Sequence, residues 1–152
     1  MQKIKLDKIT QQKEDFLPLL LLADDGPHLR NYLKKGELFI LSVTDGAVIG
    51  AVVVTEKYPR QYEIENFAVA TEYQRQGYGK VMMEHLIKQY QNRADVLMVG
   101  TDDVSGNVQF YKKCGFEETQ ILKNYFVEHY EHALFDRGRQ LKDKVYLRKN
   151  LK

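Results

Sequence analysis

The stretch IENFAV at residues 64–69, followed by QRQGYG at residues 74–79, decides how this 152-residue chain is organised. β-Branched and aromatic residues dominate the first run, which predicts a strand. Gly77 and Gly79 permit positive φ angles and a close approach of a ligand to the backbone, so they predict a tight turn. An amphipathic segment then continues to about Arg93. The sequence therefore predicts a strand, a glycine turn and a helix in succession.

Apolar residues recur after the turn at the spacing of one helical face. They are Gly79, Met82, Met83, Leu86, Ile87 and Tyr90. This spacing predicts a helix with one buried and one hydrated face. A helix that begins at a glycine turn points the free N–H groups of its first turn at whatever lies there, and such a turn suits a phosphate or pyrophosphate.

Three phosphate-binding patterns compete for this turn. The P-loop requires Ser or Thr after its lysine, but Lys80 is followed by Val81. The dinucleotide fingerprint requires a third glycine where Met82 stands. The pattern Gln/Arg-x-x-Gly-x-Gly/Ala is met at every position from Gln74 to Gly79. In this the chain resembles the GNAT superfamily of N-acetyltransferases, whose members bind the pyrophosphate of acetyl-CoA on that turn. An ordinary tight turn between a strand and a helix is the simpler alternative.

A second motif lies about thirty residues downstream. The run FYKKCGF at residues 110–116 is similar to the family pattern Phe/Leu-Tyr-x-x-x-Gly-Phe, so Tyr111 matches the motif tyrosine. Many members carry an Asn seven residues before that tyrosine, near the pantetheine arm of the cofactor. Here the position is Val104, and Asn107 is the nearby candidate for the contact.

The resemblance implies a GNAT fold over a single domain, residues 1–152. This is an α/β (α+β) fold with a mixed, mostly antiparallel, seven-stranded splayed sheet flanked by about four helices. Strands are expected at residues 4–9, 38–43, 47–55, 62–69, 96–100, 119–127 and 144–151. Helices are expected at residues 14–23, between a cap at residues 24–27 and a stop at Gly36, from the glycine turn to about residue 93, and at residues 104–114.

The resemblance also implies the cofactor, acetyl-CoA, as acetyl donor. Backbone groups at the end of the central strand would pair with the pantetheine arm, and backbone amides of the turn would hold the pyrophosphate. The candidate cofactor-binding residues are Phe67, Ala68, Val69, Gln74, Arg75, Gln76, Gly77, Tyr78, Gly79, Lys80 and Asn107.

The implied reaction is direct transfer of acetyl to a primary amine, without an acyl-enzyme. An amine acceptor arrives protonated, so a base is needed, and Glu63 stands where some members carry a base glutamate; Glu65 or a water chain are the alternatives. Tyr111 would protonate the departing thiolate, unless it is a core tyrosine. Cys114 as a covalent nucleophile is the competing idea, but it has no neighbouring His in sequence.

Composition limits the partners. The chain has 23 Lys and Arg against 21 Asp and Glu, a net charge of +2, which argues for neither nucleic acid nor a membrane surface. Its start has no apolar targeting segment and it has one cysteine, so a cytoplasmic location is expected. His129 and His132 lack further ligands at metal-site spacing, so they are interpreted as surface residues and no metal is expected.

The acceptor is expected to be a small-molecule amine, because Glu63, Glu65, Asp102 and Asp103 would surround the splay with negative charge. A protein or peptide N-acetyltransferase is an alternative within the same chemistry. A non-catalytic module that senses acyl-CoA would carry the same two motifs. A homodimer is compatible with the sequence.

Overall fold

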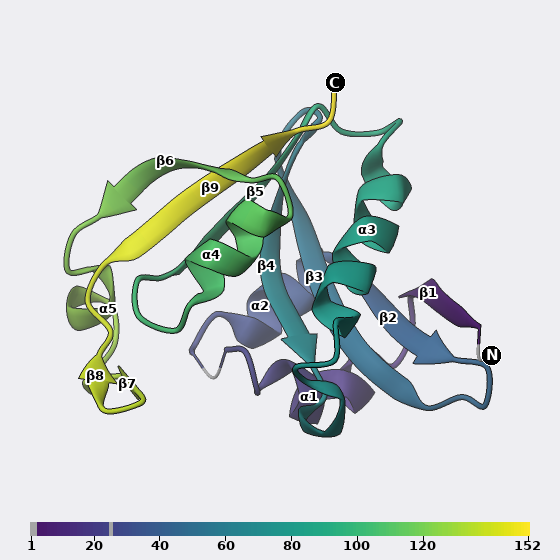
Figure 1. Ribbon diagram of the computed structural model, residues 1–152, viewed down its shortest axis with the longest axis horizontal. Coiled ribbons are helices and arrows are strands. Elements are labelled where there is room, and N and C mark those ends of the chain that lie inside the picture. Colours follow the sequence, from purple (N-terminus) through teal and green to yellow (C-terminus); the bar gives the residue numbers. More distant parts are fainter. Residues whose placement is uncertain (1–2, 25) are drawn as a thin grey trace. The chain divides into compact units, whose positions relative to one another are not determined.

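The computed structural model describes residues 3–24 and 26–152, which form two compact units divided after Asp95 (Figure 1). The first unit contains β1 (Ile4–Ile9), α1 (Leu17–Leu20), α2 (Leu29–Lys35), β2 (Glu37–Val43), β3 (Val48–Tyr58), β4 (Gln61–Val69) and α3 (Tyr78–Tyr90). The second contains β5 (Val96–Asp102), α4 (Asn107–Lys113), β6 (Glu117–Leu122), α5 (Tyr125–Glu128), β7 (Phe135–Asp136), β8 (Arg139–Gln140) and β9 (Lys144–Asn150).

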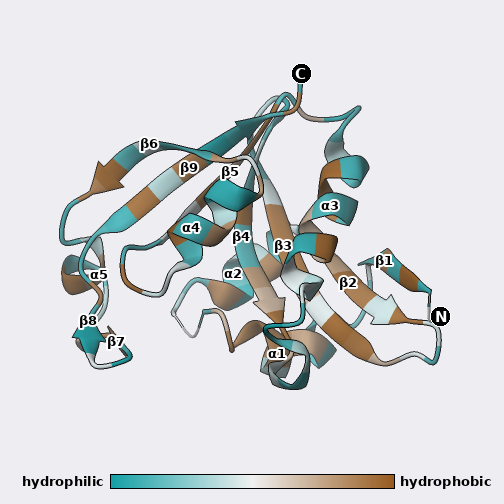
Figure 2. Ribbon diagram, viewed as in Figure 1, coloured by the Kyte–Doolittle hydropathy of each residue, from teal (hydrophilic) through white to brown (hydrophobic). Residues whose placement is uncertain are grey.

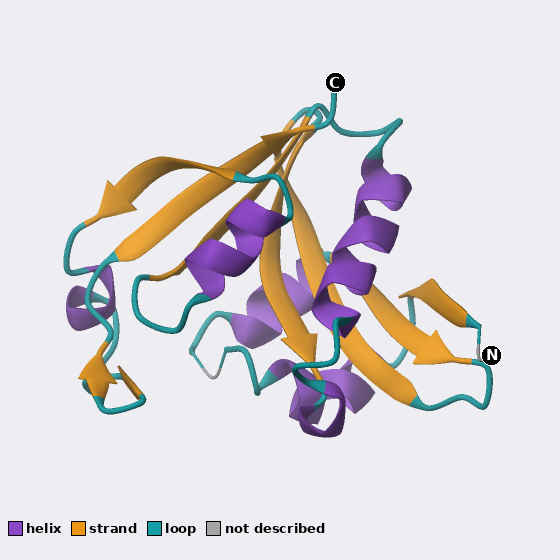
Figure 3. Ribbon diagram, in the orientation of Figure 1, coloured by secondary structure: helices purple, strands orange, loops and turns teal. Residues whose placement is uncertain are grey.

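The strands of the first unit form an antiparallel meander in the order β1-β2-β3-β4 (Figure 3). Every residue from Leu38 to Val43 of β2 is buried, because both faces of this part of the sheet are covered. Leu38 and Ile40 pack with α1 and α2, whereas the ring of Phe39 contacts Tyr90 of α3 at 5.8 Å between centroids. Figure 2 shows the resulting hydrophobic stretches along β2 and β3.

A β-bulge interrupts β4 at Glu65. Val53 pairs with Asn66 and Val54 pairs with Ile64, so Glu65 is an extra residue on its strand. The buried side chains before and after the bulge point in opposite directions. Tyr62 packs on Tyr90 of α3, with ring centroids 4.9 Å apart, whereas Asn66 bonds to residues of α1 and α2. The bulge therefore reverses the face of the sheet to which the side chains of the second half of β4 point, just before the strand reaches the glycine turn.

In the second unit, β9 lies between β5 and β6 and pairs antiparallel with both. Val145 and Leu147 are buried on one face of β9, and Lys144 and Tyr146 alternate with them on the other. The prediction of seven main strands in mostly antiparallel pairs is thus correct. A short hairpin, β7–β8, is added within the loop that precedes β9.

Three local predictions are wrong. The strand predicted at residues 119–127 ends at Leu122 and is replaced by α5, because Asn124 takes a left-handed conformation (φ 58°) and the N–H of Phe126 bonds to the carbonyl of Lys142. With α5, residues 3–24 and 26–152 contain five α-helices, close to the expected number of about four. The helix predicted from Val104 begins only at Asn107, after Gly106 at φ 92°. The helix predicted at residues 14–23 is a 3₁₀ turn followed by α1, with Pro18 in its first turn.

Across residues 3–24 and 26–152, no helix has the length and apolarity needed to cross a bilayer.

Candidate functional site

The turn between β4 and α3 is built by its own polar groups. The side-chain amide of Gln74 donates to the carbonyl of Val69 at 3.0 Å, and that of Gln76 donates to the carbonyl of Glu72 at 3.0 Å. Arg75 and Gly77 take positive φ angles of 62° and 87°. The two glutamine side chains thus hold the turn in shape.

The first turn of α3 offers backbone N–H groups without an acidic or capping side chain. Gly77 is the N-cap, no side chain caps it, and no acidic residue lies in the first turn. The N–H of Val81 bonds to the carbonyl of Gly77 at 3.3 Å, so the N–H groups of Tyr78, Gly79 and Lys80 precede the first intrahelical bond. They lie at the positive end of a 13-residue helix, where an anion is favoured.

The space beside the turn is open. A Cβ added at Gly77 would meet no atom within 4 Å, while the φ of 87° itself favours glycine. Arg75 and Lys80 are exposed and add positive charge on either side. An open, basic turn at a helix N-terminus has the chemistry to bind a pyrophosphate.

Close packing fixes this turn against the sheet. Phe67, Ala68 and Val69 pair with Val52, Ala51 and Gly50 of β3. A Cβ at Gly50 would lie 2.8 Å from the carbonyl oxygen of Ala68 and 2.9 Å from the sulfur of Met82, so only glycine lets α3 approach the strands here. The end of β4 and the start of α3 therefore hold a defined position relative to each other.

The two candidate bases on β4 differ in their surroundings. Glu65 Oε2 accepts a hydrogen bond of 2.7 Å from the hydroxyl of Thr55 and forms an ion pair of 2.7 Å with Lys57. Glu63 is half-buried and pairs across the ladder with Thr55. Glu65 is thus held by two side chains of β3, Thr55 and Lys57.

A buried polar cluster lies on the α1–α2 face of the bulge. The amide nitrogen of Asn66 donates to the carbonyl of Leu20 and to the hydroxyl of Tyr32, each at 2.9 Å, and Tyr32 donates to Asp24 at 2.8 Å. Burial raises the pKa of Tyr32, and the nearby carboxylates of Asp24 and Glu65 raise it further. Sequence reasoning missed this cluster, because its members are separated by up to 46 residues.

Tyr111 in the second unit is a buried phenol at the middle of α4. It is 6% exposed, and its ring contacts Phe110 and Phe116 with centroids 5.2 and 5.8 Å apart. Burial raises the pKa of Tyr111, and the nearby Cys114 and Asp102 raise it further. The phenol is therefore protonated at any physiological pH and can donate a hydrogen bond.

Asn107 is exposed at the first position of α4, and its N–H donates to the hydroxyl of Ser105 at 3.3 Å. Asp102, expected to contribute negative charge at the acceptor, instead accepts bonds from the N–H groups of Val104 and Ser105 and from the Ser105 hydroxyl. Its carboxylate organises the loop before α4. The expected acidic cluster is thus weakened, because Glu65 and Asp102 both have donors of their own.

The histidines of the long loop are not arranged for a metal. His129 is exposed, stacks on Tyr125 at 4.2 Å between ring centroids, and its Nδ1 lies 2.9 Å from the carbonyl oxygen of Tyr125. Within the described part of the chain, no group of three His, Cys, Asp or Glu residues could hold a metal ion.

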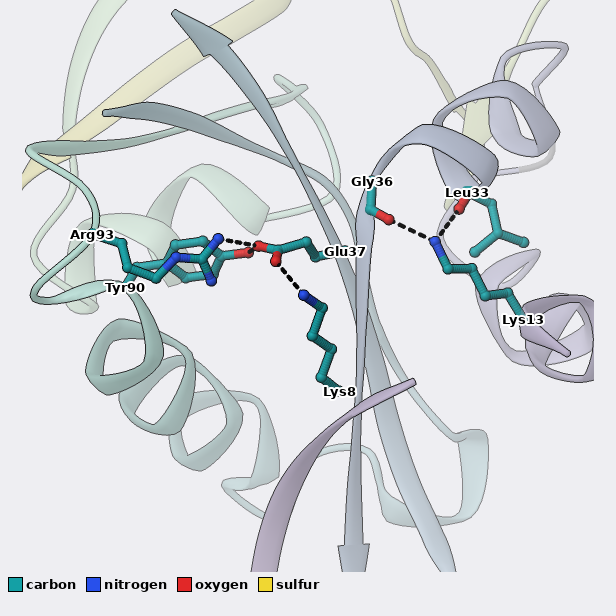
Figure 4. A network of polar contacts seen from close by, with 7 residues as sticks. All are labelled: Lys8, Lys13, Leu33, Gly36, Glu37, Tyr90 and Arg93. Atoms are coloured by element: carbon teal, nitrogen blue, oxygen red, sulfur yellow. Dashed lines mark hydrogen bonds and ion pairs between the residues drawn. The ribbon is translucent and has the colours of Figure 1, made fainter. Parts of the chain in front are cut away.

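A second polar network fixes the far end of α3, and sequence reasoning missed it (Figure 4). Glu37 of β2 accepts bonds from Lys8 at 2.7 Å, Tyr90 at 2.6 Å and Arg93 at 2.9 Å. Burial opposes the ionisation of Glu37, but these three donors outweigh it and hold the pKa of its carboxyl below the ordinary value. In the same view, Lys13 donates to the carbonyls of Leu33 and Gly36 at the end of α2.

Comparison with known proteins bears on these features. Residues 7–116 match the model of the acetyltransferase (GNAT) family. Over 150 residues the chain is 31% identical to the uncharacterized N-acetyltransferase YvbK of Bacillus subtilis, covering 97% of this chain and 96% of that protein. The crystal structure of a GNAT family acetyltransferase from Elizabethkingia anophelis with acetyl-CoA bound has a TM-score of 0.90 and 31% identity, over 97% of each chain. The predicted fold is therefore confirmed.

The name of a further relative states the acceptor of that enzyme. The ribosomal protein bS18-alanine N-acetyltransferase of Escherichia coli K12 is 28% identical over 95 residues, which are 60% of this chain and 64% of that enzyme.

Proposed function

The chain belongs to the GNAT acetyltransferase family, and from this premise we propose that it transfers the acetyl group of acetyl-CoA directly to a primary amine of a small molecule. The observation that carries the proposal is the uncapped N-terminus of α3 behind a left-handed glycine. Gly77 at φ 87° beside open space, with no acidic side chain in the first helical turn, supports anion binding there.

Acetyl-CoA supplies the acetyl group as an activated thioester when it is bound. The N–H groups of residues 76–80 would hold its pyrophosphate, and Arg75 and Lys80 would add positive charge. Backbone groups of residues 67–69 would pair with the pantetheine arm in the manner of an added strand. Asn107 is the candidate for a side-chain contact to that arm.

Glu63 would accept the proton that the amine must lose before it attacks. A lysine-like amine has a pKa of about 10.4 and is almost fully protonated near neutral pH, so it carries no free lone pair on arrival. We assign this role to Glu63 because it stands where some members of the family carry a base glutamate; Glu65 lies two residues further along β4 and bonds to Thr55 and Lys57. An ordered water could carry the proton where direct reach is lacking.

Tyr111 would donate a hydrogen bond to the sulfur as negative charge develops on it. The pKa of a thiol is about 8.5, below that of a buried phenol, so complete proton transfer from Tyr111 to the thiolate would be uphill. Hydrogen bonding within a dry site stabilises the leaving group without that transfer. Solvent can then supply the proton.

The test is release of free CoA thiol from acetyl-CoA in the presence of a panel of amines and peptides. We expect thiol release that depends on a small primary amine. Peptides with a free N-terminal alanine belong in the panel because a relative acts on ribosomal protein bS18. Faster thiol release with such peptides than with any small amine would mean that the acceptor is a protein rather than a small molecule. Binding of CoA without turnover of any acceptor would favour a sensor.

A further inference from the structure

In the second unit, the ammonium group of Lys144 contacts two aromatic rings. Lys144 Nζ lies 4.4 Å from the ring centroid of Tyr125 and 5.0 Å from that of Tyr146. Both distances fall within the range over which the negative face of an aromatic ring attracts a cation. We call Tyr125 and Tyr146 the tyrosine pair.

The tyrosine pair is set up by the fold around it. Lys144 and Tyr146 lie on the same face of β9, since they are two residues apart, and that face is opposite to the buried Val145. Tyr125 comes from the first turn of α5, which is tied to the segment before β9. The N–H of Phe126 donates to the carbonyl of Lys142 at 2.9 Å.

A second tie involves a side chain. The N–H of Asn124 donates to Asp143 Oδ1 at 2.9 Å, and Lys123 forms an ion pair with the other oxygen of that carboxylate at 3.4 Å. Hydrogen bonding to Asn124, together with the positive charge of Lys123, lowers the pKa of Asp143. Both ties hold the ring of Tyr125 next to the start of β9.

Glycine on the neighbouring strand makes room for the lysine stem. Gly100 of β5 pairs directly with Tyr146. A Cβ added at Gly100 would collide with Lys144 Cε and would lie 2.9 Å from the Tyr146 ring. Any larger residue at position 100 would therefore push the ammonium or the ring out of place.

We propose that the tyrosine pair is a binding site for a charged, non-reacting ammonium group of the amine acceptor, and that Lys144 occupies it as an internal competitor. This rests on the proposed function. The ammonium held there carries no free lone pair and cannot attack a thioester. The acceptor therefore bears at least two amino groups, one that reacts and one that stays charged on the rings.

The competition has a measurable consequence. An acceptor must displace the Lys144 ammonium before its own ammonium reaches the rings. Replacing Lys144 by methionine keeps the length of the stem and removes the charge. Two cation–π contacts at a partly exposed site together change a binding affinity by about tenfold. K144M should therefore bind a diamine roughly five to ten times more tightly than the unaltered protein.

The first experiment measures binding alone, with tetramethylammonium as a probe that cannot be acetylated. Tyrosine ring signals in NMR spectra are followed during titration of the full chain. We expect K144M to bind the probe at least about fivefold more tightly than the unaltered protein. The double variant K144M/Y125L should lose that gain. K142M removes an exposed positive charge two residues away and should leave the affinity unchanged.

The second experiment compares 1,4-diaminobutane with 1-aminobutane in the thiol-release assay. K144M should lower the KM for the diamine about fivefold and leave the KM for the monoamine unchanged. K144R keeps a competing cation and should leave both KM values unchanged. Circular dichroism and thermal melting establish that each variant is folded.

The outcomes separate the two proposals. Equal probe affinity in K144M and the unaltered protein would overturn the ammonium site, whatever the enzyme does. Tighter probe binding in K144M with no shift in diamine KM would overturn its role for the acceptor. Absence of thiol release with every amine, together with tighter probe binding, would overturn the proposed function while retaining an ammonium site on the tyrosine pair.

Discussion

Asn66 on β4 donates a hydrogen bond of 2.9 Å to the hydroxyl of Tyr32 on α2, and this contact exists because the bulge at Glu65 turns Asn66 toward that helix. The same amide nitrogen donates to the carbonyl of Leu20, which can only accept, so the amide orientation is fixed. Asn66 Oδ1 is buried without a hydrogen-bond partner among the described residues. The cluster thus depends on Tyr32 for much of its bonding.

Y32F should destabilise the protein by about 1–3 kcal/mol, because it removes the hydroxyl that joins Asn66 to Asp24 inside the fold. The free energy of unfolding is measured by urea denaturation. Y58F is the matched control, since Tyr58 is 67% exposed at the end of β3. Equal unfolding midpoints for the two variants would show that the cluster contributes nothing.

G77V should weaken CoA binding by about tenfold or more, because the branches at Cβ would fill the space beside the N–H groups of the turn. G46V is a close control: Gly46 lies at φ 90° in the β2–β3 turn and also has no atom within 4 Å of an added Cβ. Both variants carry the same kind of backbone strain. Isothermal titration calorimetry should therefore show weaker CoA binding for G77V than for G46V. Equal affinities would mean that the pyrophosphate does not bind at this turn.

E37Q should reduce the loss of folding stability that the protein shows as the pH falls. A carboxyl whose pKa is lowered in the folded state contributes stability that is present above its unfolded-state pKa and is lost as the pH falls through the folded-state value. Glu37 has an ordinary value of 4.5 and a lowered folded value, so unaltered protein should lose this stability below about pH 4.5.

Thermal melting between pH 3 and 7 measures the effect. E37Q should melt lower than the unaltered protein at pH 7, by an amount equivalent to roughly 1–3 kcal/mol, and the difference should shrink toward pH 3. E84Q, on the exposed face of α3, should follow the unaltered protein at every pH. A constant difference across the range would mean that Glu37 does not ionise differently on folding.

E63Q should remove the acidic limb of the pH dependence of kcat/KM, because the amide cannot accept a proton from the amine. Turnover should fall by about 10²-fold, the usual size for the loss of one acid–base group. E65Q should have a smaller effect, since Glu65 bonds to Thr55 and Lys57. An unchanged rate and profile in E63Q would assign the base to Glu65, to water or to the free amine itself.

Y111F should lower kcat by about 10²-fold and leave CoA affinity nearly unchanged, because the variant keeps its ring contacts with Phe110 and Phe116 and loses only the hydroxyl. Since burial raises the pKa of Tyr111, the unaltered enzyme should show no loss of activity from tyrosine ionisation up to pH 10. Full activity in Y111F would make Tyr111 a core residue only.

Local sequence determined the elements whose signals lie within a few residues. The apolar spacing from Met82 to Tyr90 was enough to predict α3, since helical periodicity is a property of neighbouring residues. Gly77 identified the left-handed turn for the same reason. The two short motifs identified the family because each is a contiguous run that needs no knowledge of packing.

Tertiary structure alone decided what depends on residues far apart in the chain. The bulge at Glu65 depends on the pairing register between β3 and β4, and no residue type predicts it. The segment after Leu122 has strand-forming residues, yet it forms α5 because Lys142 and Asp143 supply acceptors for its N–H groups. The tyrosine pair around Lys144 likewise requires α5 to be brought against β9. Periodicity reports local backbone preference, whereas hydrogen bonds and ring contacts between residues far apart in the sequence are formed only when the chain has folded.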